Sequence, residues 1–190
     1  MTTATIFGNG NMGKAIAAIF TAGGIDVQQI DSHTAPTEVD GEIVVLAAPY
    51  SAFGDIISAY SEKFAGKILV DISNPIDFET FRLAVPADSS AAAQLAEQLP
   101  DTSVVKAFNT TFAATLASGS VGANATTVLV AGDDVHAKDA VVQAIAAGGA
   151  QAIDVGALTA ARELEAIGYL QLQLAVGEKI AFTGGFSVAK

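Results

Sequence analysis

Three glycines near the N-terminus have the spacing of a loop that binds phosphate groups. Residues 5–18 read TIFGNGNMGKAIAA, in which Gly8, Gly10 and Gly13 fit the pattern G-x-G-x-x-G. In a dinucleotide-binding loop the first glycine permits a tight turn, and the second lets the backbone approach a pyrophosphate. The third lets the following helix pack against a strand. The free N–H groups and the dipole at the start of that helix attract the phosphates.

The segments on both sides of the loop favour this interpretation. Residues 4–7 form an apolar run typical of a strand, and residues 11–22 carry apolar side chains at helical spacing. A glycine loop between a strand and a helix is the context in which the motif is informative. A purely structural turn and a site for a methyl-donor nucleoside are the alternatives. We predict a dinucleotide, bound by the loop residues Gly8, Asn9, Gly10, Asn11, Met12 and Gly13.

The identity of the dinucleotide depends on the end of the second predicted strand. There the chain reads Asp31, Ser32, His33. An acidic residue at this position binds the ribose hydroxyls and favours NAD. A serine hydroxyl and an imidazole can instead bind a 2′-phosphate, and a solvated loop residue is the alternative reading of His33. Physical reasoning from these residues leaves both nucleotides open.

Composition narrows the class of protein. The chain has 190 residues and a net charge of −11, so nucleic acid gains no counterion-release affinity and is excluded as a partner. There is no cysteine, which excludes disulfides and thiol chemistry.

The N-terminus lacks the pattern of a signal peptide, and no segment is apolar enough to span a membrane, so we expect a cytoplasmic protein. Only 15% of residues are charged, which favours a surface covered by a second subunit.

Strands and helices are predicted to alternate along the whole chain. The predicted strands are 4–7, 26–30, 42–49, 67–72, 103–108, 126–132 and 151–156. The predicted helices are 11–22, 51–62, 89–98, 135–147 and 158–176. This order is typical of a doubly wound, mostly parallel α/β sheet of the Rossmann type, and we predict a single domain over 1–190. The connection after 26–30 is too short for a helix and is expected to cross the sheet as an extended loop.

Several motifs together resemble one family. FGNGNMG (7–13), VLAAP (45–49), DISNP (71–75), VVKAFNT (104–110) and ARELEAIGYLQLQLA (161–175) occur in an order and spacing similar to those of the NADPH-dependent deazaflavin-coenzyme oxidoreductases. That family shares its N-terminal fold with pyrroline-5-carboxylate reductases and with the cytosolic domain of membrane metalloreductases. The resemblance implies NADP rather than NAD, since Ser32 and His33 match the serine and basic residue that hold the 2′-phosphate. An imidazole binds a phosphate best when it is protonated. With His33 in this role, NADPH affinity is expected to fall as the pH rises from about 6 to about 8.

The strand ends are predicted to hold the nicotinamide half of the cofactor. Ligands of open α/β sheets bind at the carboxyl edge, where these ends meet. The residues in question are Ala47, Ala48, Pro49, Asn74, Pro75, Ala107 and Asn109. Each proline can instead merely stop a strand, and each asparagine can cap a turn.

No catalytic side chain and no set of metal ligands is apparent. Hydride transfer between planar rings depends on positioning and on exclusion of water, so none is required. We expect Lys106 to face outward through strand alternation. The predicted activity is hydride transfer between NADP(H) and a planar acceptor such as a deazaflavin or a flavin. The alternatives are a non-catalytic redox-sensing NADP(H)-binding protein and a reductase of a small imine or carbonyl compound.

The C-terminal helix and tail, 158–190, are predicted to add a dimer and pocket element. An apolar stripe is expected to pack on the sheet, with further apolar side chains supporting a homodimer. The stripe comprises Leu158, Ala161, Leu164, Ile167, Leu170 and Leu174. Phe182 and Phe186, from one subunit or its partner, are expected to close the nicotinamide pocket.

Overall fold

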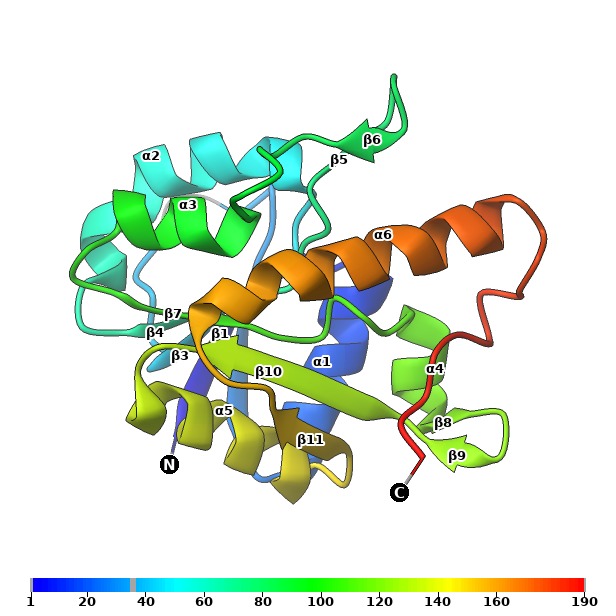
Figure 1. Ribbon diagram of the computed structural model, residues 1–190. Coiled ribbons are helices and arrows are strands. Elements are labelled where there is room, and N and C mark those ends of the chain that lie inside the picture. The colour runs from blue at the N-terminus through cyan, green and yellow to red at the C-terminus, as the bar shows by residue number, and fades with distance from the viewer. Residues whose placement is uncertain (1, 35–36, 190) are drawn as a thin grey trace.

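The centre of the molecule is a twisted sheet with helices on both faces (Figure 1). The computed structural model describes residues 2–34 and 37–189. In this part of the chain the main sheet has seven strands in the order β11-β10-β7-β4-β3-β1-β2. Their bounds are β1 Thr3–Phe7, β2 Asp26–Ile30, β3 Ile43–Leu46, β4 Ile68–Asp71, β7 Ser103–Lys106, β10 Thr127–Gly132 and β11 Gln151–Asp154.

The strands from β2 to β7 in this order are all parallel, so their carboxyl ends meet at one edge. β10 pairs with β7 in the antiparallel sense, and β11 is parallel to β10. The predicted mostly parallel α/β sheet is therefore confirmed, with a reversed pair of strands at one side. Because β10 and β11 run in the opposite direction, only the parallel strands from β2 to β7 have their carboxyl ends at this edge.

Alternate strand residues face two separate hydrophobic clusters. Ile6, Val45 and Val70 pack with α1 (Asn11–Ala22), α4 (Ala113–Ser118) and α5 (Val135–Ala147). Phe7, Val44 and Leu69 face the opposite way and pack with α2 (Phe53–Phe64), α3 (Ala91–Gln98) and the first turn of α6 (Ala161–Val176). The 3₁₀ turns η1 (Tyr50–Ala52) and η2 (Leu158–Ala160) precede α2 and α6. Both faces of the central strands are thus covered, as expected for a doubly wound sheet.

The connection from β2 to β3 crosses β1 without a helix in its described residues, 31–34 and 37–42. Thr5 of β1 organises this crossing. Its buried hydroxyl donates to Gln28 Oε1 at 2.6 Å and accepts the Gly41 N–H at 2.9 Å. A Cβ on Gly41 would lie 2.4 Å from the Thr5 nitrogen, so only glycine lets the chain pass this close.

Two small hairpins have no counterpart among the predicted elements. One consists of β5 (Ile76–Asp77) and β6 (Arg82–Leu83), and the other of β8 (Ser120–Val121) and β9 (Asn124–Ala125). The tail beyond α6 runs back past α4 to the second hairpin (Figure 1). Near the start of α4 the ring centroids of Phe182 and Phe112 lie 5.1 Å apart, and at the hairpin Asn124 Nδ2 donates to Ser187 Oγ at 2.9 Å.

The buried face of α6 differs from the predicted apolar stripe. Leu158, Ala161 and Leu164 are buried as expected, but Leu170 is exposed. From Glu165 onward the buried face carries polar or small residues instead, namely Glu165, Gly168, Gln171 and Ala175. The prediction was wrong here because it considered only the spacing of apolar residues. A helix face can also be buried through polar side chains that bind polar loops, and apolar spacing does not indicate such a face. Among the described residues, no helix combines the length and apolar character needed to cross a membrane.

Candidate functional site

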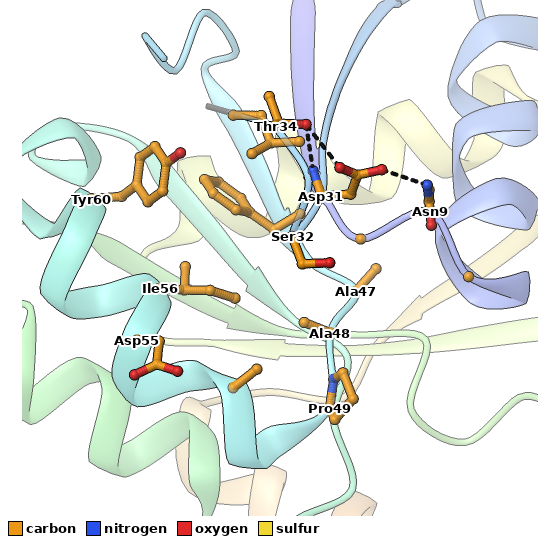
Figure 2. A pocket seen from close by; sticks show the side chains of 15 residues that line it. Asn9, Asp31, Ser32, Thr34, Ala47, Ala48, Pro49, Asp55, Ile56 and Tyr60 are labelled. Carbon is orange, nitrogen blue, oxygen red and sulfur yellow. Dashed lines mark hydrogen bonds between the residues drawn. The ribbon is translucent and has the colours of Figure 1, made fainter. Parts of the chain in front are cut away.

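A cavity of about 540 Å³ lies at the carboxyl edge, between the glycine loop and α2 (Figure 2). Several predicted cofactor-binding residues line it together: Gly8, Asn9, Gly10, Ser32, Ala47, Ala48 and Pro49. The α2 side of its wall includes Asp55, Ile56 and Tyr60, which no motif in the sequence marks as cavity residues. Asn11, Met12 and Gly13 begin α1, directly after the loop.

The three glycines of the loop have different constraints. Gly8 has a φ of +112°, and a Cβ there would lie 2.3 Å from the Ala47 carbonyl oxygen. A Cβ on Gly13 would lie 2.3 Å from the Gly8 carbonyl oxygen. Gly10 has an ordinary φ of −67°, and an added Cβ would meet nothing within 4 Å. Protein packing therefore requires glycine at the first and third positions, whereas the second leaves open space beside the backbone.

That open space suits a pyrophosphate. The first N–H groups of any helix lack an intrahelical partner, and Gly10, the N-cap of α1, provides no side-chain acceptor for them. Backbone N–H groups and the positive end of the helix dipole bind phosphate oxygens without basic side chains. The residues present therefore fit a dinucleotide at its phosphates.

A network of hydrogen bonds holds the Asp31 carboxylate at the wall of the cavity, next to Asn9. Its Oδ2 accepts from Asn9 Nδ2 at 2.6 Å, and its Oδ1 accepts the His33 N–H at 2.9 Å and the Thr34 hydroxyl at 3.0 Å. Figure 2 shows this carboxylate pointing to Asn9. The His33 N–H, followed by the Thr34 hydroxyl, holds the pKa of Asp31 below its usual value. Asp31 is therefore an ionised loop organiser whose oxygens already have donors.

Ser32 and His33 differ in their placement. Ser32 lines the cavity, and Figure 2 shows its side chain directed toward the space between the glycine loop and α2. His33 is exposed and does not line the cavity. In the part of the chain that the structure describes, the lining includes the acidic residues Asp31 and Asp55 and no Lys or Arg. A phosphate in this cavity would therefore have to be bound by backbone N–H groups and hydroxyls.

The remaining predicted residues lie further along the edge, beyond β3. Asn74 Nδ2 donates to the Asn109 carbonyl at 2.9 Å, and Asn109 Nδ2 donates to Asn74 Oδ1 at 2.8 Å. Pro75 and Ala107 are buried beside them. Phe108 has a φ of +63°, a strained conformation for a non-glycine residue and one that recurs at functional sites. These residues form a linked pair of loops after β4 and β7 and do not line the 540 Å³ cavity.

Lys106 does not face outward, which corrects the prediction from the sequence. It is fully buried, and its ammonium donates to Asp71 Oδ2 at 2.8 Å, to Glu165 Oε1 at 2.7 Å and to the Ser73 carbonyl at 2.7 Å. Strand alternation correctly places Lys106 and Val105 on opposite faces of the sheet. However, α3 and α6 cover the face on which Lys106 lies. Neither Asp71 nor Glu165 was recognised as its partner, because each is distant in the sequence.

The electrostatics of this cluster affect neighbouring groups. Burial raises the pKa of the Glu165 carboxyl, while the charge and hydrogen bond of Lys106 oppose the rise. Burial also raises the pKa of Tyr50, and the charges of Glu165 and Asp71 add to the effect. The neutral Tyr50 hydroxyl donates to Gln94 Oε1 at 2.8 Å. The buried cluster of Lys106, Asp71 and Glu165 therefore lies close to the ends of β4 and β7 and does not line the cavity.

Comparison with known proteins finds reductases among the relatives of this chain. No family model matches the chain. An F420-dependent NADP reductase from Methanocaldococcus jannaschii is 31% identical over 176 residues, which cover 90% of this chain and 78% of that protein. Metalloreductase STEAP3 from Rattus norvegicus is 37% identical over 124 residues, or 65% of this chain. Those residues span only 24% of the metalloreductase.

One of the similar solved structures carries a name like that of the first of these relatives. A putative F420-dependent NADP-reductase from Arthrobacter sp. FB24 superposes with a TM-score of 0.84 and 25% identity, covering 98% of this chain and 99% of that one. The similarity therefore extends through the glycine loop, the strand ends and α6.

Proposed function

Because the chain belongs to the family of F420-dependent NADP reductases, we propose that it transfers a hydride between NADP(H) and a planar acceptor, a deazaflavin or a flavin. It is an oxidoreductase, and its cofactor is NADP. The open space beside Gly10, in a cavity at the carboxyl edge, is the observation that supports this site most directly. The predicted cofactor-binding residues and the single-domain organisation over 1–190 are part of this proposal.

Each part of the edge has a separate task. The N–H groups at the start of α1 hold the pyrophosphate. Ser32 binds the 2′-phosphate, while Asn9 keeps the Asp31 carboxylate turned away from it. Bound NADPH supplies the hydride. The loops after β4 and β7 wall the nicotinamide side, where positioning and exclusion of water are what the transfer requires.

The proposal is tested by following NADPH oxidation with a panel of deazaflavins, flavins and ferric chelates. We expect turnover with a deazaflavin or a flavin. A small cyclic imine and a small carbonyl compound are included as competing substrates. Tight NADPH binding without turnover on any acceptor would contradict hydride transfer and favour a redox-sensing protein.

Ser32→Ala is expected to lower NADPH affinity by about tenfold, the effect of losing one hydrogen bond to a charged group. NADH lacks the 2′-phosphate, so its affinity is expected to stay unchanged. Titration of both nucleotides by fluorescence measures the two affinities. Ser51→Ala, an exposed position outside the cavity lining, is the matched control. An equal loss for NADPH and NADH would remove Ser32 from the 2′-phosphate site.

A homodimer is the proposed assembly, and a cytoplasmic location stays a prediction from the sequence. Large apolar side chains are exposed on the second half of α6 and on the tail, among them Leu170, Val176, Phe182 and Phe186. Covering them in a second copy would remove apolar surface from water. Sedimentation at micromolar concentration is expected to give a dimer, and a monomer there would rule this assembly out.

A further inference from the structure

The ammonium of Lys106 joins three segments that are far apart in the sequence. Its three N–H donors are matched by Asp71 at the end of β4, by the Ser73 carbonyl just after it, and by Glu165 of α6. The side chains of Lys106 and Asp71 have no exposed surface, and that of Glu165 is 1% exposed. Lys106 is thus a buried connection between α6 and the carboxyl ends of β4 and β7.

Glu165 extends this connection to α3. Its Oε1 and Oε2 accept the Ala91 N–H at 3.0 and 3.1 Å, at the first residue of the helix. Ser90 completes the cap by accepting the Ala93 N–H at 3.0 Å. A carboxylate at a helix N-terminus also interacts favourably with the helix dipole. One side chain therefore fixes α6 both to the strand ends and to α3.

Further contacts continue along the same face of α6. We call Glu165, Gly168 and Gln171 the α6 seam. A Cβ on Gly168 would lie 2.2 Å from Asn74 Oδ1, so glycine lets the helix approach the loop after β4. Gln171 Nε2 donates to the Thr110 carbonyl at 3.2 Å in the loop after β7. Each seam residue contacts a loop or the cluster at a strand end.

The loops held by the seam lie next to the cavity along the sheet. β4 and β7 follow β3 in strand order, and the end of β3 leads into Ala47 and Ala48 of the cavity lining. A dinucleotide with its phosphates on the glycine loop extends along this edge. Its reactive ring would therefore meet the loops after β4 and β7. The strained Phe108 lies between two residues, Lys106 and Asn109, that are both tied to α6.

We propose that Glu165 and Lys106 are positioning residues for the hydride transfer. Through their ion pair, α6 holds the loops 73–75 and 107–110 in the arrangement that aligns the nicotinamide with its acceptor. This role rests on the proposed function, because it concerns the geometry of that reaction. It differs from a purely structural tie, which would contribute to folding and leave the reaction rate unchanged in folded protein.

The test compares Glu165→Met, Glu165→Gln and the exposed control Glu163→Met on the same helix. Methionine removes the ion pair and the cap at similar volume, whereas glutamine keeps an acceptor for Lys106 and Ala91. Turnover is measured well below the Tm of each variant. We expect Glu165→Met to lower kcat by about tenfold to a hundredfold, the scale of a small misplacement of reacting groups. NADPH affinity stays near that of the wild type, glutamine restores most of kcat, and Glu163→Met has no effect.

A second readout separates this inference from the proposed activity. The emission of bound NADPH at saturation reports the surroundings of the nicotinamide without any acceptor. We expect it to change in Glu165→Met and to return in Glu165→Gln. Wild-type kcat and emission in Glu165→Met, with only a lower Tm, would overturn the positioning role, as would a parallel loss of NADPH affinity. If the wild type reduces no acceptor, the proposed function fails, while the emission still shows whether the ion pair shapes the surroundings of the bound nicotinamide.

Discussion

Gly10→Ala is expected to lose most of the NADPH affinity of the protein while keeping its fold. The backbone at Gly10 has a φ of −67°, which alanine adopts without strain, and an added methyl group would meet no protein atom within 4 Å. Neither conformation nor packing explains a glycine here. Close approach of a ligand does, because the methyl group would occupy the space proposed for the pyrophosphate. We expect NADPH affinity to fall by at least about a hundredfold, or about 2.7 kcal/mol.

Stability should change little in this variant. Alanine is a poorer N-cap than glycine, and we expect a loss below about 1 kcal/mol in the free energy of unfolding. Thermal unfolding and NADPH titration together separate the two effects. Gly54→Ala is the matched control, since a Cβ there also meets nothing within 4 Å and Gly54 does not line the cavity. NADPH affinity equal to that of the wild type in Gly10→Ala would show that the phosphates bind elsewhere.

Gly8→Ala and Gly13→Ala cannot make this distinction. In each case the new Cβ would lie 2.3 Å from a backbone carbonyl oxygen, of Ala47 and of Gly8 respectively. The loop must shift in both variants, so stability and binding fall together. The difference between Gly10 and its two neighbours is therefore the informative result.

Lys106→Met is expected to give the largest loss of stability. It leaves Asp71 and Glu165 as buried carboxylates without their cation, with side chains 0% and 1% exposed. Removing one partner of a buried ion pair costs about 3–5 kcal/mol, because the remaining charge is buried and unpaired. For a protein of this size that corresponds to a fall in Tm of about 6–20 °C. Thermal and denaturant unfolding measure the change.

Two comparisons show whether the unpaired charge is the cause. Adding Glu165→Gln to Lys106→Met removes one of the two charges and is expected to recover part of the lost stability. Lys63→Met breaks an exposed pair with Glu38, whose side chains are 33% and 82% exposed, and should cost less than about 1 kcal/mol. If Lys106→Met is no more destabilising than Lys63→Met, the buried cluster does not hold these segments together.

The features that were predictable from the sequence are local ones. The strand and helix order follows from runs and periodicities within short windows, and the structure confirms the α/β sheet. Asp134 caps α5 by accepting the His136 and Ala137 N–H groups, as its position before an apolar helix indicates. The glycine loop lies between β1 and α1, as the apolar patterns on its two sides predict. Each of these depends on residues that are neighbours along the chain.

The missed features depend on residues that meet only in the folded chain. Lys106 lies 35 residues from Asp71 and 59 from Glu165, and nothing in its own strand identifies either partner. The polar seam of α6 was likewise hidden, because Glu165 and Gln171 look like solvent-facing residues until Ala91 and Thr110 are brought against them.

Short-range spacing was therefore enough to predict the sheet, the order of its elements and the loop suited to phosphates, because it decides backbone conformation and the direction of each side chain. Packing of distant segments then set which of those directions are covered by other elements. It placed Ser32 in the cavity, turned the Asp31 carboxylate toward Asn9 and buried Lys106 between two acids. Alternation along a strand specifies a side of the sheet, and burial of that side depends on helices supplied from elsewhere in the chain.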